Sequence, residues 1–308
     1  MLDSKIFVAG HRGLVGSAIV RALTARGAKQ VLTRSRTELD LLDQHSVRTF
    51  FAQEKPEVVF LAAAKVGGIL ANSTYPADFL YQNIAIAEHV IDAARHSGVR
   101  KLVNLGSSCI YPKLASQPIR EDSLLTGPLE PTNRAYAIAK IAAIELCDSY
   151  RTQYGCDFIS AMPTNLYGPH DNFDLTSSHV LPAMIRKLVD AKKVGAREVV
   201  LWGSGTPRRE FMFVEDMVDA LLLLAESYAE PGPINVGTGE DVTILDLAEM
   251  IRSAVGFSGD IVWDRSKPDG TPRKLLDVSR LRSAGFSPKT SLADGIEKTL
   301  RWYLANRA

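Results

Sequence analysis

The sequence is poor in cysteine and has no long apolar run. Its three cysteines, Cys109, Cys147 and Cys156, are too few and too irregularly spaced for a disulfide framework or a zinc site, so we expect no bound metal. The longest uninterrupted apolar runs, 58–64 and 220–225, fall far short of the ~20 residues that a membrane-spanning helix needs. We therefore expect no membrane contact.

The chain also carries almost no net charge, because 36 Lys and Arg residues face 35 Asp and Glu residues. This balance argues against a nucleic-acid partner, which needs a basic surface. The first residues lack the basic start and apolar segment of a signal peptide, so we expect a cytoplasmic protein. What is present, 308 residues that are 46% hydrophobic and 23% charged, is typical of one large folded domain or two smaller ones.

Short apolar runs alternate with helical patterns through the first half of the chain. The expected strands are 5–9, 31–33, 58–62, 101–107 and 158–163, and the helices between them are 14–26, 46–53, 77–96 and 135–154. This alternation predicts an α/β fold with a doubly wound, Rossmann-type parallel sheet. Runs such as 58–61 are apolar at every position, which is typical of strands that are covered on both faces.

The pattern changes after residue 165. A polar stretch at 167–179 precedes a helix near 181–193, and Gly- and Pro-punctuated elements lead to a last helix at 292–305. We predict a dinucleotide-binding domain at 1–166 and a smaller C-terminal α/β substrate-binding lobe at 167–308. Some segments of the lobe are expected to rejoin the main sheet.

A glycine turn follows the first strand and opens the first helix, as a dinucleotide-binding site requires. Gly10 permits the tight turn, Gly13 lets the backbone approach a pyrophosphate, and Gly16 lets the helix pack close to the strand. The helix N-terminus adds free N–H donors and a positive dipole. The whole turn is predicted to bind the cofactor, and it consists of Gly10, His11, Arg12, Gly13, Leu14, Val15 and Gly16.

The end of the second strand indicates which dinucleotide is bound. An NAD site usually has a carboxylate there for the ribose hydroxyls, whereas this chain has Thr-Arg-Ser-Arg at 33–36. Guanidinium groups suit a 2′-phosphate, so we predict NADP(H) as the cofactor, with Arg12 and Arg36 as the clamp. Arg34 has two interpretations, a phosphate contact or a solvated loop residue.

Three side chains predict a reductive site. Tyr136 and Lys140 lie one helical turn apart on one face, and a nearby cation favours the phenolate. Ser107 lies at the expected carboxyl end of the fourth strand, where ligands of such sheets bind, and its hydroxyl can hold a substrate oxygen beside the phenol.

These motifs together resemble the extended short-chain dehydrogenase/reductase family, which acts on nucleotide sugars. Four longer segments, 62–69, 105–113, 162–173 and 267–274, are similar to the branch that epimerises GDP-4-keto-6-deoxy-mannose at C3 and C5 and reduces it at C4 with NADPH. The resemblance covers nearly the whole chain and implies that activity here.

The resemblance also implies roles for further residues. Cys109 and His179 would carry protons in the epimerisation, because both titrate near enough to neutrality. Cys109 would face the same way as Ser107 if the chain there stays extended. Without the resemblance, we would interpret Cys109 as a small buried apolar residue and His179 as an ordinary loop histidine. Further implied cofactor contacts are Leu105, Gly106, Ser107, Ser108, Lys140, Pro163, Thr164, Asn165, Leu166 and His179, and the implied substrate contacts are Lys187, Trp202, Arg209 and Asp269.

Two alternatives keep the dinucleotide site. One is a nucleotide-sugar C4-epimerase or dehydratase with tightly held NAD, which needs no Cys109. The other is a noncatalytic NADP-sensing protein, which has no reason for Ser107, Tyr136 and Lys140 together. The resemblance further implies a homodimer, for which 77–96 and 135–154 are candidate interface helices. Arg208 is open between a substrate contact and a solvated side chain.

Overall fold

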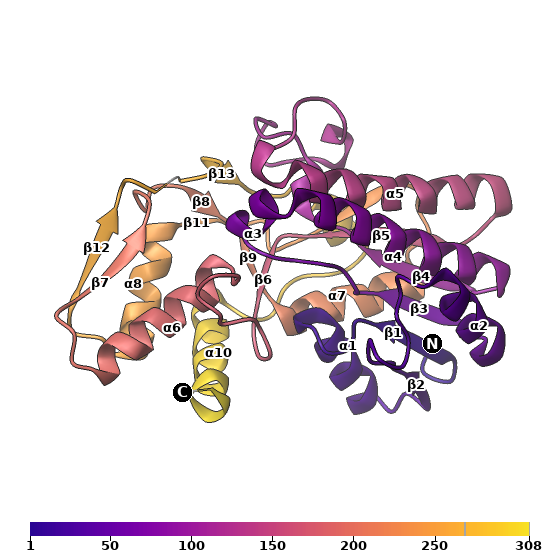
Figure 1. Ribbon diagram of the computed structural model, residues 1–308, viewed down its shortest axis with the longest axis horizontal. Coiled ribbons are helices and arrows are strands. Elements are labelled where there is room, and N and C mark those ends of the chain that lie inside the picture. The colour runs from indigo at the N-terminus through magenta and orange to yellow at the C-terminus, as the bar shows by residue number, and fades with distance from the viewer. Residues whose placement is uncertain (268, 308) are drawn as a thin grey trace.

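Six parallel strands form the main sheet of the computed structural model, which describes residues 1–267 and 269–307 (Figure 1). Pro268, in the 267–274 motif, lies outside the described residues. The sheet order is β10-β5-β4-β3-β1-β2. Its strands are β1 (Lys5–Ala9), β2 (Gln30–Leu32), β3 (Val58–Leu61), β4 (Lys101–Leu105), β5 (Phe158–Pro163) and β10 (Pro233–Val236).

Helices cover both faces of this sheet, which confirms the predicted doubly wound α/β fold. The covering helices are α1 (Leu14–Ala25) and α7 (Val214–Ser227) on one face and α2 (Gln44–Glu54), α4 (Pro76–His96) and α5 (Arg134–Tyr154) on the other. Within β1, Ile6 and Val8 pack in the core shared with α1 and α7, whereas Phe7 and Ala9 pack in the opposite core. Successive strand residues point to opposite faces, which explains the uninterrupted apolar runs.

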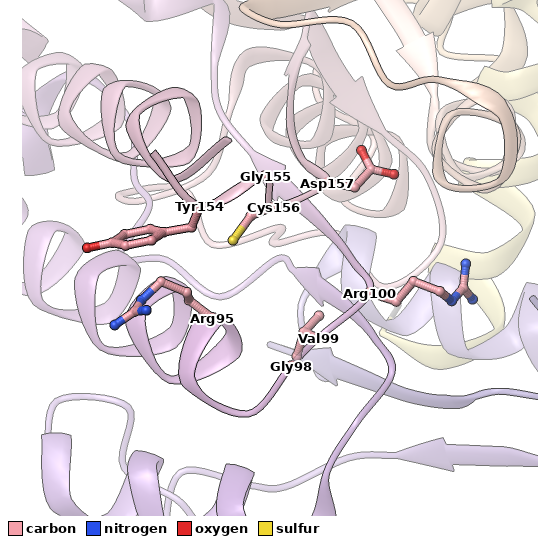
Figure 2. A pocket seen from close by; sticks show the side chains of 8 residues that line it. All are labelled: Arg95, Gly98, Val99, Arg100, Tyr154, Gly155, Cys156 and Asp157. Atoms are coloured by element: carbon pink, nitrogen blue, oxygen red, sulfur yellow. The ribbon is translucent and has the colours of Figure 1, made fainter. Parts of the chain in front are cut away.

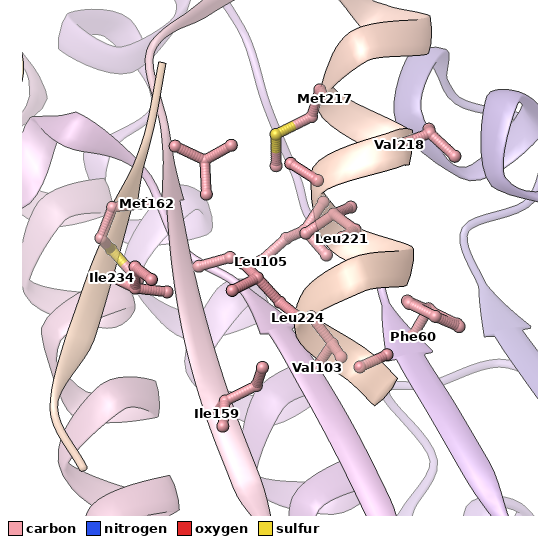
Figure 3. Close-up of a cluster of buried hydrophobic side chains, with 14 of the residues drawn as sticks. Phe60, Val103, Leu105, Ile159, Met162, Met217, Val218, Leu221, Leu224 and Ile234 are labelled. Carbon is pink, nitrogen blue, oxygen red and sulfur yellow. The ribbon is translucent and has the colours of Figure 1, made fainter. Parts of the chain in front are cut away.

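The core beneath α7 brings early and late parts of the chain together. Figure 3 shows Met217, Leu221 and Leu224 of α7 against Val103 of β4 and Ile234 of β10. Both α7 and β10 follow residue 166, and β10 pairs in parallel with β5. The region that surrounds the main sheet is therefore built from two separate stretches of sequence.

The smaller lobe packs around a second apolar core (Figure 1). Its helices are α6 (Val180–Lys193), α8 (Ile244–Val255) and α10 (Leu292–Asn306), and its parallel pair is β7 (Glu198–Trp202) with β12 (Asp260–Asp264). Short strands lie between this lobe and the main sheet. They are β6 (Asn165–Tyr167) with β9 (Phe211–Phe213), and β8 (Arg208–Arg209) with β11 (Val242–Thr243) and β13 (Arg273–Lys274).

The fourth strand ends earlier than the apolar pattern predicts. β4 stops at Leu105, and the Ser107 hydroxyl accepts a hydrogen bond from the Cys109 N–H at 3.2 Å. This cap starts the 3₁₀ turn η1 (Ser108–Ile110), so the expectation of an extended chain through Cys109 is wrong. The remaining short helices are α3 (Ile69–Thr74), η2 (Glu121–Ser123), η3 (Pro131–Asn133) and α9 (Ser279–Ser283).

A buried polar contact anchors the chain after this turn. The Tyr111 hydroxyl donates to Asn235 Oδ1 at 2.6 Å, and Asn235 Nδ2 donates to the Ile119 carbonyl at 2.9 Å. Asn235 belongs to β10, so the segment after Cys109 is fixed to the main sheet. In the described part of the chain, no helix combines the length and apolar character that crossing a membrane requires.

Asp171, between β6 and α6, makes the stability of the fold pH-dependent. Its side chain is 9% exposed, Oδ1 accepts the Asn172 N–H, and Oδ2 has no hydrogen-bond partner among the described residues. Burial raises the pKa of Asp171 to about 7. The native state therefore holds a proton that the unfolded chain releases near pH 4, so stability falls as pH rises between these values.

We expect Asp171→Asn, which stays neutral, to gain stability relative to the parent protein across that window. The gain in the free energy of unfolding should be small at pH 4 and should grow to roughly 1–3 kcal/mol by pH 8. Thermal unfolding of both proteins at several pH values measures it. A difference in melting temperature that does not change with pH would contradict the assignment.

Candidate active site

The glycine turn lies where β1 meets α1, at the carboxyl edge of the main sheet. Gly10 has φ +83°, and a Cβ there would lie 2.7 Å from the Ala63 nitrogen. A Cβ on Gly16 would lie 2.2 Å from the Gly10 oxygen, whereas a Cβ on Gly13 would make an ordinary contact with that oxygen at 3.5 Å. Gly10 and Gly16 are thus required by backbone conformation and close packing.

The same turn fits a bound dinucleotide. No side chain of the described residues caps the N-terminus of α1, so its first N–H groups can bind an anion. The Nδ1 atom of His11 is buried and has no hydrogen-bond partner in the described part of the chain. A phosphate-bearing ligand would supply acceptors for these donors, and neighbouring Leu14 and Val15 form the first turn of α1.

The three arginines near this turn differ in what they contact. Arg34 donates to Glu54 at 2.7 Å and lies over the Phe50 ring, so it holds β2 against α2 and is not a solvated loop residue. Arg36 is 74% exposed and its nearest carboxylate, Asp40, is 3.9 Å away. Arg12 is also exposed. Arg12 and Arg36 therefore have guanidinium groups available for a ligand.

Tyr136, Lys140 and Ser107 lie together at the end of β4. The Lys140 ammonium is 5.8 Å from the centre of the Tyr136 ring and donates to the Leu105 carbonyl at 2.7 Å. Burial lowers the pKa of Lys140 to about 8. The Tyr136 ring packs edge-on against Phe79, with 6.3 Å between the ring centres.

The pKa of Tyr136 is shifted in the direction opposite to our expectation. Burial raises it, the nearby Cys109 raises it further, and a hydrogen bond with Ser107 opposes both effects. The Lys140 ammonium, which is itself buried and bonded to the Leu105 carbonyl, does not outweigh the burial of the phenol. The phenol is therefore protonated at neutral pH and is suited to donate a proton.

Cys109 is surrounded by two donors that the sequence did not predict. Its sulfur accepts from Asn133 Nδ2 at 3.2 Å and from Lys274 Nζ at 3.6 Å. The Lys274 ammonium also influences the pKa of His179, the residue before α6. The pKa of His179 is lowered by burial and by the Lys274 ammonium, although the side chain still reaches solvent. A neutral imidazole and a hydrogen-bonded thiol thus both lie near the Lys274 ammonium.

In the smaller lobe, a cluster of polar and aromatic side chains surrounds the end of β7. Trp202 is 58% exposed, and the ammonium groups of Lys187 and Lys267 lie 5.6 Å and 5.5 Å from its ring centre. Asp269 accepts from the Ser204 N–H at 2.7 Å, and Arg209 Nη2 lies 3.5 Å from the Asp269 carbonyl oxygen. Burial lowers the pKa of both Lys187 and Arg209. This arrangement offers a stacking surface and cations for an aromatic, anionic ligand.

Arg208 is not available to this cluster. Its guanidinium donates to the Asp241 carboxylate at 2.9 Å and to the Asp241 carbonyl at 2.8 Å. Arg273 donates to the same carboxylate. Arg208 therefore stabilises the junction of β8 and β11, and its guanidinium is bonded to Asp241 although the side chain is partly exposed.

Glu210 links the two parts of the site and was not predicted. Its buried carboxylate accepts N–H groups of Thr238 at 2.6 Å, Gly239 at 2.8 Å and Leu276 at 2.9 Å. Its carbonyl accepts from Asn165 at 2.8 Å and Thr164 at 3.2 Å. The segment 163–166, with Pro163 and Leu166, is thereby tied to the chain that carries Arg209. Gly106 and Ser108 complete the strand-end backbone next to it.

A surface hollow lies at the opposite edge of the sheet (Figure 2). It is formed where β4 and β5 begin and α4 and α5 end. Arg95 lies over the Tyr154 ring at 4.3 Å, and Asp157 accepts from Lys101 and Arg151. The predicted reacting groups are all absent from its lining. Among the described residues there is also no group of three His, Cys, Asp or Glu side chains that could hold a metal.

Comparison with known proteins agrees with this geometry. The chain is 57% identical to GDP-L-fucose synthase 1 of Arabidopsis thaliana, over 99% of this chain and 94% of that protein. It is 54% identical to GDP-L-fucose synthase of Escherichia coli (strain K12), over 100% of this chain and 98% of that protein. Among solved structures, a GDP-L-fucose synthetase from Naegleria fowleri bound to NADP is similar, with a TM-score of 0.92, 31% identity, and coverage of 99% of this chain and 94% of that one. Residues 6–237 match the model of the NAD dependent epimerase/dehydratase family, and the chain belongs to this family.

Proposed function

We propose that the protein epimerises GDP-4-keto-6-deoxy-D-mannose at C3 and C5 and reduces it at C4 with NADPH, giving GDP-L-fucose. The observation that carries this proposal is that Tyr136 and Cys109 lie near each other after the end of β4, with His179 near the Lys274 ammonium that bonds the Cys109 sulfur. Tyr136, with Ser107 and Lys140, suits a ketone reduction, and Cys109 with His179 suits epimerisation. The full-length similarity to GDP-L-fucose synthases supports the same activity.

The cofactor is NADP(H), which supplies the hydride that C4 receives. The 10–16 turn and the N-terminus of α1 would hold its pyrophosphate. Arg12 and Arg36 would hold the 2′-phosphate, since both are exposed and the carboxylate paired with Arg36 is 3.9 Å away. Lys140, which reaches Leu105 across the strand end, would hold the ribose.

In the reduction, the protein supplies a proton and fixes the ketone. The Tyr136 phenol, protonated at neutral pH, donates its proton to the C4 oxygen as negative charge develops there. The Ser107 hydroxyl orients that oxygen beside the phenol. The Lys140 ammonium lies 5.8 Å from the ring and stabilises the phenolate that results.

In the epimerisation, the protein must remove and return protons at carbons next to the ketone. The C4 carbonyl acidifies these C–H groups, because the electron pair left behind spreads onto its oxygen. A base on one face takes the proton and an acid on the other face returns one. Cys109 and His179 are the two groups at the site with suitable chemistry.

The decisive experiment is incubation with GDP-4-keto-6-deoxy-D-mannose and NADPH, followed by identification of the product by NMR. We expect GDP-L-fucose, with NADPH consumed in equal amount. A 4-reduced product that keeps the manno configuration would contradict the epimerase half. A preference for NAD, with no net reduction, would instead favour the C4-epimerase or dehydratase alternative.

Arg36→Ala is expected to weaken NADPH binding about 10- to 100-fold, because a charge-assisted contact to the 2′-phosphate is lost. NADH binding should be unchanged, so the ratio of the two dissociation constants, measured by fluorescence titration, reports the contact. Arg34→Ala is the matched control, because Arg34 is bonded to Glu54. It should lower the melting temperature without changing the ratio. Equal losses for both cofactors would argue against the clamp.

We also propose that the enzyme is a cytoplasmic homodimer that associates through α4 and α5. Tyr81 and Ile84 of α4 and Ile138 of α5 are exposed apolar side chains on adjacent helices, which supports an interface there. The three cysteines are free, which suits a reducing compartment. Sedimentation should show a dimer that Tyr81→Glu dissociates, and a monomeric parent protein would contradict the proposal.

A further inference from the structure

We propose that Asn133 is a positioning residue for epimerisation, and that its amide N–H, together with Lys274, holds the Cys109 sulfur as a proton acceptor. This inference rests on the proposed function and deepens it, because it says how the thiol becomes a base. Asn133 would not touch the substrate. It would act through the sulfur atom of Cys109.

The first argument is the number of donors at one sulfur. Asn133 Nδ2 lies 3.2 Å and Lys274 Nζ lies 3.6 Å from Sγ of Cys109. A thiolate accepts hydrogen bonds only, whereas a thiol must place its own hydrogen among these donors. Two N–H groups aimed at the sulfur, one of them charged, therefore favour the ionised form over the neutral one.

The second argument is what the Asn133 side chain does not do. Asn133 is the N-cap residue of α5, a position at which asparagine normally accepts a hydrogen bond from the helix backbone. Here its side chain makes no cap, and Oδ1 is buried with no hydrogen-bond partner among the described residues. The Asn133 amide thus does not make the usual cap, and its nitrogen bonds to the Cys109 sulfur instead.

The third argument is the balance of charge around the thiol. Lys113 is paired with Glu130 at 2.9 Å, and Arg273 is paired with Asp241. Lys274 forms no ion pair within the described part of the chain, so its charge is left for the sulfur.

The other titratable groups near the thiol are the Tyr136 phenol on α5 and the His179 imidazole before α6. The phenol is neutral at pH 7, because its pKa is raised, and the imidazole is neutral too, because its pKa is lowered. Glu130, whose side chain lines the same pocket as Cys109, is paired with Lys113, so among the described residues the unpaired charge next to the sulfur is that of Lys274.

The step itself is a proton transfer to sulfur. The C–H bond next to the C4 ketone breaks, an S–H bond forms on Cys109, and the electron pair spreads onto the ketone oxygen. A proton from an acid on the opposite face then forms the new C–H bond. The thiol and that acid exchange protons with water and return to their starting states.

Because Asn133 starts the helix that carries Tyr136 three residues later, one helix start would position both halves of the reaction. The two halves can nevertheless be separated experimentally. Epimerisation is followed without NADPH, as incorporation of solvent deuterium at C3 and C5 of the keto sugar. Thiol ionisation is followed as the pH dependence of Cys109 alkylation by iodoacetamide, resolved by peptide mass spectrometry.

The test uses Asn133→Asp, Asn133→Ala and, as matched control from the same 3₁₀ turn, Thr132→Ala, since Thr132 bonds to Glu130 and not to Cys109. Aspartate keeps the shape of asparagine but replaces the donor with a negative charge. We expect Asn133→Asp to move the midpoint of the alkylation profile up by about one pH unit or more and to slow deuterium exchange about tenfold or more at neutral pH. Asn133→Ala should do both to a smaller extent, and raising the pH should partly restore exchange.

If Asn133 only packed against its neighbours, Asn133→Ala would have the larger effect, because alanine removes most of the side chain and aspartate keeps its shape. The proposal is overturned if Asn133→Ala is worse than Asn133→Asp, or if exchange is lost while the alkylation profile stays where it is. NADPH affinity checks that the variants are folded. If the parent protein itself exchanges no deuterium, the proposed function fails, whereas the alkylation profiles still decide whether Asn133 controls the thiol.

Discussion

Tyr136→Phe is expected to slow NADPH oxidation by the keto sugar about 10²- to 10⁴-fold, the range that general acid catalysis typically contributes. The substitution removes one oxygen and keeps the ring, including its edge-on contact with Phe79. The C4 oxygen would then lack its proton donor, because the Lys140 ammonium is bonded to the Leu105 carbonyl.

Deuterium incorporation at C3 and C5 should continue in this variant, because it depends on Cys109 and His179. Steady-state NADPH consumption and NMR of the recovered sugar measure the two halves in one sample. Tyr154→Phe, in the hollow at the opposite edge of the sheet, removes a hydroxyl outside the site and serves as the control. Unchanged NADPH oxidation in Tyr136→Phe would overturn the reductive mechanism, and the noncatalytic alternative would then gain support.

Cys109→Ser is expected to have the opposite effect, with deuterium exchange lost and NADPH binding kept. A serine hydroxyl is a far weaker acid than a thiol, so the group beside Asn133 and Lys274 can no longer act as a base near neutral pH. Deuterium exchange at C3 or C5 should fall by about 10²-fold or more, and formation of GDP-L-fucose should fall with it. NADPH should still bind, because Cys109 lies outside the glycine turn.

The control for this variant is Cys156→Ser, since Cys156 lies in the hollow at the opposite edge of the sheet (Figure 2). It should leave both half-reactions intact. NMR of the sugar after incubation in D₂O checks each carbon separately. Exchange at full rate at both carbons of Cys109→Ser would remove Cys109 from the mechanism and contradict its assignment as a base in the epimerisation.

These two variants also distinguish the proposed reaction from its rivals. A C4-epimerase or dehydratase with bound NAD would lose activity in Tyr136→Phe but has no need of Cys109. The proposed enzyme requires both residues, each for a different bond. The arrangement at the end of β4 therefore predicts that Tyr136→Phe loses reduction and that Cys109→Ser loses epimerisation.

Much of the fold was predictable because its signals are local. Apolar runs of strand length between amphipathic segments predicted the parallel sheet, and β1, α1, α4 and α5 lie close to their expected bounds. The boundary errors have a physical cause. The Ser107 side chain caps a turn, so β4 ends at Leu105 although the residues after it look extended in sequence.

The candidate site also contains some residues that could be predicted from the sequence and others that could not. Gly10 and Gly16 could be assigned from sequence, because their requirement arises from backbone conformation and close packing at one turn. Arg34 and Arg36 could not be told apart, since only folding brings Glu54 beside one of them. Nothing in the sequence indicated the role of Glu210, because a glutamate next to two arginines is usually a surface residue. Its burial is visible only in the folded chain.

By itself, the sequence determined the fold class, the cofactor turn and the Tyr136–Lys140 pair, because each depends on residues a few positions apart. The tertiary structure decided what surrounds Cys109: Asn133 is 24 residues away along the chain and Lys274 is 165. It also decided the direction of the Tyr136 pKa shift, because burial depends on every element packed around the ring. Desolvation and long-range contacts are properties of the folded chain as a whole, and no local pattern encodes them.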